Sequence, residues 1–152
     1  MGAWGTRSSE NDAVHDLLSM AGRKNAHYGF EDPGELTNEQ LEQFIMNRFV
    51  VPLQLSNDEK HVQAALGTLR KLNELIHPMH FLGLIIWGFD RGWTFNRDIL
   101  TIADESSMKL IYDQNEWFRY IHMWAHPKIR HYRLLKEMCK IKQAIKEKND
   151  GR

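Results

Sequence analysis

The sequence predicts an all-α protein, and three observations lead to this expectation. Apolar side chains recur at helical spacing along much of the chain, and helix-capping residues precede several of these runs. The stretch 79–89 is apolar throughout and could be a strand, but the chain offers no second strand to pair with it. We therefore expect one compact domain over residues 1–152, an irregular bundle of about six or seven helices.

The last third of the chain, residues 107–148, has the pattern of two consecutive helices separated at Pro127. Proline cannot donate a backbone hydrogen bond, and it drives the preceding residue out of the helical region. A break or kink is therefore expected at this step. The apolar stripe of the second helix has spacings of four, three and four residues and consists of Leu134, Met138, Ile141 and Ile145.

Capping signals place the helix starts in the first half of the chain. Ser9 is the expected N-cap of a first helix. After a loop over 22–36, Thr37 and Gln40 form a capping box for the next helix. Pro52 is expected to keep 50–53 extended, because proline disfavours helix at that point.

Further signals follow in the second half. Three more helix starts are expected. Ser56 with Glu59 begins a helix to about residue 76, and Asn96 begins a short helix to Ala103. Ser106 or Ser107 caps the long helix that follows. Between them, 79–89 is expected to form a short buried helix that ends in a turn over 90–92.

Opposite charges are concentrated in the two halves of the chain, although the net charge is zero. Residues 1–59 contain 4 Lys and Arg against 10 Asp and Glu, whereas residues 60–152 contain 16 against 10. One interpretation is that the acidic half packs beside the basic half. The other is a binding site on the last helix for nucleic acid or an acidic protein, with contacts from Arg130, Arg133, Lys136, Lys140 and Lys142.

Composition points to a cytoplasmic protein without a membrane segment. The single cysteine, Cys139, excludes an intrachain disulfide, and we expect it to be a small core residue. The longest apolar run is far shorter than the roughly 20 residues of a spanning helix. Four tryptophans, which we expect in the core rather than on a stacking platform, are Trp87, Trp93, Trp117 and Trp124.

The first residues resemble a known group of sequences. The chain opens MGAWG and continues with END at residues 10–12. This pattern resembles a family of small uncharacterised bacterial proteins with the same opening, over about the first 18 residues. The resemblance implies a small bacterial or phage-related cytosolic protein with no assigned chemistry.

Histidines form two pairs that could be considered as metal ligands. His77 and His80 flank Pro78, and His122 and His126 are separated by one helical turn. Two imidazoles are fewer than the three or four ligands that zinc sites use, and no acidic residue stands at ligand spacing. We therefore expect structural histidines and no metal or other cofactor, with these four residues as the alternative metal ligands.

Arg119 and His126 carry a second resemblance. An arginine and a histidine separated by six residues, just before a proline, are similar to the Arg-x(4–6)-His motif of the HEPN superfamily of small all-α domains. That resemblance implies an RNA-cleaving homodimer in which Arg119 binds the phosphate and His126 is the general acid or base. The sequence departs from the family pattern at Tyr120, where a small polar residue is usual.

The function expected from these observations is binding without catalysis. No complete catalytic constellation appears, while the charge distribution is strongly polarised. We expect a small regulatory or inhibitor protein that uses its polarised surface to bind a macromolecular partner, in the first place a protein. The alternative is a HEPN-like ribonuclease, or a nucleic-acid-binding protein that uses the basic C-terminal helix.

Overall fold

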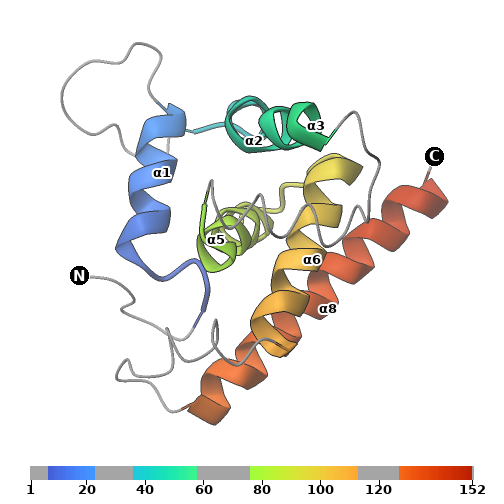
Figure 1. Ribbon diagram of the computed structural model, residues 1–152. Coiled ribbons are helices and arrows are strands. Elements are labelled where there is room, and N and C mark those ends of the chain that lie inside the picture. The colour runs from blue at the N-terminus through green and yellow to red at the C-terminus, as the bar shows by residue number, and fades with distance from the viewer. Residues whose placement is uncertain (1–6, 23–35, 58–75, 113–126, 152) are drawn as a thin grey trace.

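The computed structural model of the protein describes residues 7–22, 36–57, 76–112 and 127–151. These residues form six α-helices and one π-helical segment, and no strand occurs among them. The protein is all-α, as the sequence predicts (Figure 1). In chain order the elements are α1 (Asp12–Gly22), α2 (Asn38–Ile45), η2 (Met46–Val50), α3 (Val51–Asn57), α5 (Pro78–Phe89), α6 (Arg97–Tyr112) and α8 (Pro127–Gly151).

Helix α5 lies at the centre of the described bundle, between α1 and α6 (Figure 1). Every residue over 81–88 is buried, which confirms the short buried helix predicted for this stretch. The helix begins at the His-Pro step. His77 Nδ1 accepts a hydrogen bond of 3.1 Å from the Met79 amide, and Pro78 occupies the first turn, where no backbone donor is required.

The segment before α1 packs directly on α5. At Gly83 an added Cβ atom would lie 2.5 Å from Val14 Cγ2 and 2.6 Å from the Ser8 carbonyl oxygen. The absence of a side chain at this position therefore allows α1 and its leading segment to approach α5 closely. The N-cap of α1 is Asn11, whose Oδ1 accepts from the Val14 amide at 2.9 Å, so the prediction of Ser9 as the cap was wrong.

Helices α2 and α3 are joined by the π-helical segment η2 without an extended linker. The capping box of Thr37 and Gln40 is confirmed, with bonds of 3.2 and 2.9 Å. The expected extended stretch 50–53 was wrong, because Pro52 lies in the first turn of α3. Proline is tolerated at such a position, and the wider π turn before it ends the preceding α-helix. Ser56, expected as a cap, lies within α3.

Helices α6 and α8 lie side by side and run antiparallel (Figure 1). Asn96 caps α6, since its Oδ1 accepts from the Ile99 amide at 3.0 Å. The helix continues past Ala103 to Tyr112, so the expected short helix and the expected caps at Ser106 and Ser107 were wrong. Both serine hydroxyls instead donate 2.8 Å bonds to carbonyls of the preceding turn, which keeps them satisfied inside the helix.

Several predicted features lie outside the described residues. They are the loop that was expected to follow α1, the greater part of the helix expected over 56–76, and most of the first helix of the last third, with Trp117, Arg119, His122, Trp124 and His126. Helix α8 itself begins at Pro127, so the predicted helix start at the His-Pro step is confirmed.

Candidate functional site

A row of exposed side chains runs along one side of α8, and we call these five residues the basic stripe. Its members are Ile129, Tyr132, Arg133, Lys136 and Lys140, all of them exposed. Their spacings of three, one, three and four residues keep them on one side of a helix with 3.6 residues per turn. Ile129 and Tyr132 are 48% and 58% exposed, so the stripe combines an apolar end with three cations.

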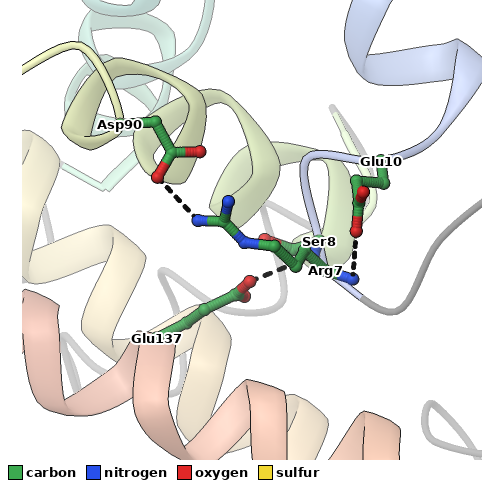
Figure 2. Close-up of polar contacts among 5 residues, drawn as sticks. All are labelled: Arg7, Ser8, Glu10, Asp90 and Glu137. Atoms are coloured by element: carbon green, nitrogen blue, oxygen red, sulfur yellow. Dashed lines mark hydrogen bonds and ion pairs between the residues drawn. The ribbon is translucent and has the colours of Figure 1, made fainter.

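Glu137 lies beside this stripe but is directed into the protein. Its side chain is buried, and its Oε2 accepts a hydrogen bond of 3.2 Å from the backbone amide of Ser8 (Figure 2). The other oxygen, Oε1, is buried and has no hydrogen-bond partner among the described residues. The carboxyl group of Glu137 therefore points into the protein and does not lie among the exposed cations of the stripe, although it remains within electrostatic range of Lys140.

The segment before α1 holds a second ion pair next to Glu137. Arg7 Nη2 lies 2.7 Å from Asp90 Oδ1, at the C-terminal end of α5, and the Arg7 amide donates to Glu10 Oε1 at 3.0 Å (Figure 2). Hydrogen bonding to Asp90 raises the pKa of the Arg7 guanidinium. Asp90 therefore neutralises Arg7, and both side chains are held near the buried carboxyl group.

A cavity of about 190 Å³ lies where these groups meet. Its lining combines the Arg7–Asp90 pair, the buried Glu137 and the three cations of the basic stripe. With Arg7 balanced by Asp90, three cations remain against a single carboxyl group. The electrostatic character of the cavity is thus positive, whichever protonation state Glu137 adopts.

Burial is the main influence on Glu137. It raises the pKa of the carboxyl group from 4.5 to about 7, despite opposing effects from Ser8 and from the charges of Arg7 and Lys140. At neutral pH the group is therefore divided between its protonated and ionised forms. A protonated carboxyl has an O–H donor, whereas the ionised form only accepts hydrogen bonds.

The structure brings together only part of the binding set expected from the sequence. Arg133, Lys136 and Lys140 line one cavity, but Lys142 lies nine residues from Arg133, two and a half turns away, and so on the opposite side of α8. Lys142 Nζ is 3.0 Å from Asp104 Oδ1 on α6, so this lysine joins two helices. Helix α8 includes Arg130, whose side chain is not among those described.

Three groups complete the cavity without having been predicted from the sequence: Arg7, Asp90 and Glu137. One signal for Glu137 was available. It stands three residues after Leu134 and four before Ile141, at a position that extends the apolar stripe, and both of those residues are buried. Arg7 and Asp90 are separated by 83 positions, and no sequence pattern relates them.

The histidine pair in the described residues, His77 and His80, lies at the start of α5. The rings of His77 and His80 lie 5.6 Å apart between centroids, and His77 Nδ1 caps α5. Burial, with His77 nearby, lowers the pKa of His80 to about 4. The described residues contain no group of three or more His, Cys, Asp or Glu side chains that could hold a metal ion. His122 and His126 lie outside the described residues.

The HEPN-like residues stay a prediction, because Arg119 and His126 lie outside the described part of the chain. Of the tryptophans, Trp87 is buried as expected. The centroid of its ring lies 5.5 Å from that of Trp93. The Arg91 guanidinium lies 3.4 Å from the Trp87 ring centroid. Trp93 is partly buried against the core. The expectation for Cys139 was wrong, since this residue is exposed and lines an open groove of about 660 Å³ with Phe89 and Trp93.

Comparisons with protein-family models, with curated proteins and with solved structures find no match to this chain. The fold and the site thus define an all-α protein with a basic stripe and a positively charged cavity on its last helix. Within the parts that the structure describes, no helix has the length and apolar character needed to cross a bilayer.

Proposed function

We propose that the protein is a small, non-catalytic regulatory binding protein that holds an acidic protein partner on the basic stripe of α8. One observation carries the proposal. Glu137 is the sole acidic residue between positions 127 and 146, and it is buried away from the stripe. The exposed cations of the stripe therefore have no acidic neighbour on their own side of this part of the helix.

The apolar end of the stripe favours a protein over a nucleic acid as the partner. Exposed Ile129 and Tyr132 stand one helical turn from Arg133 and Lys136. Aromatic and arginine side chains are enriched where protein interfaces concentrate their binding energy, with charges at the rim. Lys136 Nζ also lies 5.3 Å from the Tyr132 ring centroid, which places a cation over an exposed aromatic face.

The test compares two doubly substituted proteins of equal charge. Arg133→Glu with Lys140→Glu reverses the stripe, and Lys146→Glu with Lys148→Glu makes the same change in charge at exposed positions nearer the C-terminus. The probe is a fluorescent peptide rich in Glu with interspersed Leu and Phe, measured by anisotropy. We expect saturable binding by the wild type and by the Lys146/Lys148 protein, and loss of binding in the stripe variant.

Nucleic acid is tested in the same assay with a labelled single strand and a duplex. If three cations contact phosphates, the logarithm of the association constant should fall with the logarithm of salt concentration at a slope of roughly −2 to −3. Nucleic-acid binding with that slope, lost in the stripe variant while the peptide does not bind, would assign the stripe to nucleic acid. Equal behaviour of the two variants would exclude the basic stripe as the specific binding surface, because Lys146 and Lys148 also lie on α8.

A further inference from the structure

We propose that the cavity beside Glu137 is a binding site for a phosphate group, in which the Glu137 carboxyl is protonated and donates a hydrogen bond to the bound anion. This inference deepens the proposed function, on which it rests, because three members of the basic stripe line the same cavity. It names the chemical group of the partner that the cavity would accept.

Charge in the cavity matches a phosphate better than a carboxylate. Arg7 is paired with Asp90 at 2.7 Å, which leaves Arg133, Lys136 and Lys140. A phosphate monoester carries a charge of about −1.5 to −2 at neutral pH and presents three acceptor oxygens. Three cations can each approach one of those oxygens, whereas a carboxylate has one negative charge and two oxygens.

The buried oxygen of Glu137 is the second observation. Oε2 accepts from the Ser8 amide, whereas Oε1 and the hydroxyl oxygen of Ser8 are both buried and have no hydrogen-bond partner among the described residues. An unsatisfied polar atom in this setting is costly. Oε1 has almost no accessible surface, so an anion in the cavity relieves this cost only when the Glu137 side chain turns toward it. The unprotonated oxygens of a phosphate or sulfate group are acceptors, so they can pair with Oε1 only when Oε1 carries a proton.

The surroundings of Glu137 favour this protonated form once an anion is bound. The charged groups that face it are Arg7 from the segment before α1, Asp90 from the end of α5, and Arg133, Lys136 and Lys140 of α8 itself. Among the described lining residues, α6 contributes no ionisable side chain. An ionised Glu137 would repel phosphate across the cavity, so the anion and a proton should bind together.

Calorimetric titration with inorganic phosphate and with sulfate tests the site. We expect saturable binding by the wild type. Arg133→Gln, Lys136→Gln and Lys140→Gln should each weaken binding by about tenfold or more, because each removes a charge-assisted hydrogen bond. Lys146→Gln, at an exposed position outside the cavity lining, is the matched control and should bind like the wild type.

Proton uptake separates this site from a merely basic surface. Sulfate stays a dianion near neutral pH, so any proton taken up on binding goes to the protein. The buffer supplies that proton, so the heat of binding differs between two buffers of different ionisation enthalpy, and the difference gives the number of protons taken up. We expect the wild type to take up a fraction of a proton at pH 7 and almost none at pH 5. Glu137→Gln should keep anion binding and lose the uptake. The wild-type measurement decides the question even if that variant does not fold.

Phosphate can reach the cavity as the free anion or on a partner protein. A phosphoserine peptide and its unphosphorylated counterpart distinguish these sources, and stronger binding of the phosphopeptide than of inorganic phosphate would indicate a phosphorylated partner. Absence of saturable anion binding, or uptake unchanged in Glu137→Gln, would overturn the inference. If the acidic peptide still binds the stripe in that case, the proposed function stands without the phosphate site; if neither probe binds, both fail.

Discussion

The Ser8 amide donates a hydrogen bond of 3.2 Å to Glu137 Oε2, and this contact joins residues 129 positions apart. Through it the segment before α1 is held against the middle of α8 (Figure 2). The same segment contacts α5 at Gly83 through the Ser8 carbonyl. Ser8 thus connects the central helix with the helix that carries the basic stripe, and the shape of the cavity depends on its position.

Glu137 should make the protein less stable as pH rises. Its folded-state pKa of about 7 exceeds the value of 4.5 for an unperturbed carboxyl, so between these values the folded protein binds more protons than the unfolded one. The free energy of unfolding should therefore fall from pH 4.5 to 7, by on the order of 3 kcal/mol from this group.

Urea denaturation at a series of pH values measures this dependence. Glu137→Gln should reduce the dependence of the free energy of unfolding on pH but should not abolish it. Glu105 also contributes, because burial beside Asp104 raises the pKa of its carboxyl group to about 7. Glu105→Gln is the companion variant and should remove part of the remaining slope. A Glu137→Gln protein whose stability depends on pH as the wild type does would contradict the burial of an ionisable Glu137.

His80 should have the opposite pH dependence. With a folded-state pKa of about 4, its ring stays neutral in the folded protein while the unfolded chain takes up a proton below about pH 6.5. Acid should therefore destabilise the protein through this residue between pH 6.5 and 4. Proton NMR of the ring should show no titration above about pH 5, with His80→Gln used to assign the signal; a midpoint near 6.5 would show that the ring is solvated.

Gly83→Ala should destabilise the protein, although alanine favours helices over glycine. The new Cβ would lie 2.5 Å from Val14 Cγ2 and 2.6 Å from the Ser8 carbonyl, so α1 and its leading segment must move. We expect a loss of about 1–3 kcal/mol in the free energy of unfolding, measured by chemical denaturation. A gain in stability would mean that α1 does not pack on α5 as described.

Asn11→Ala should cost about 1 kcal/mol in stability, since the residue caps α1 through the Val14 amide. Its Nδ2 also donates to the Ser8 carbonyl at 2.8 Å, so the substitution should disturb the segment beside Glu137. Thr37→Ala removes the exposed cap of α2 and is the matched control. Both variants should lose stability, but only Asn11→Ala should weaken anion binding. Equal anion binding by the two variants would show that the cap at Asn11 does not influence the cavity.

Cys139 should react with Ellman's reagent in the native protein at close to one thiol per chain, because its side chain is exposed. A buried residue would react only after denaturation. The reaction in the presence and absence of urea distinguishes the two cases, and Cys139→Ser provides the blank.

Local sequence determined the helices whose signals are complete within a few residues. The capping box of Thr37 and Gln40, the cap at Asn96 and the start of α8 at Pro127 all follow from short-range chemistry. The apolar run 81–88 had to be buried, because the hydrophobic effect leaves such a stretch no exposed side. These features depend on neighbours in sequence, which is why spacing alone predicts them.

Tertiary structure decided the features for which several local choices were open. Ser106 and Ser107 can each cap the start of a helix, or donate a hydroxyl hydrogen bond to a carbonyl of the preceding turn inside a helix. In this protein both hydroxyls donate to carbonyls within α6, which packs on α8. The cavity is the clearest case, since Arg7, Asp90 and Glu137 meet only when three distant segments pack together. Burial of Glu137 and the resulting shift in its pKa depend on that packing, because desolvation is a property of the folded surroundings and not of the residue's place in the sequence.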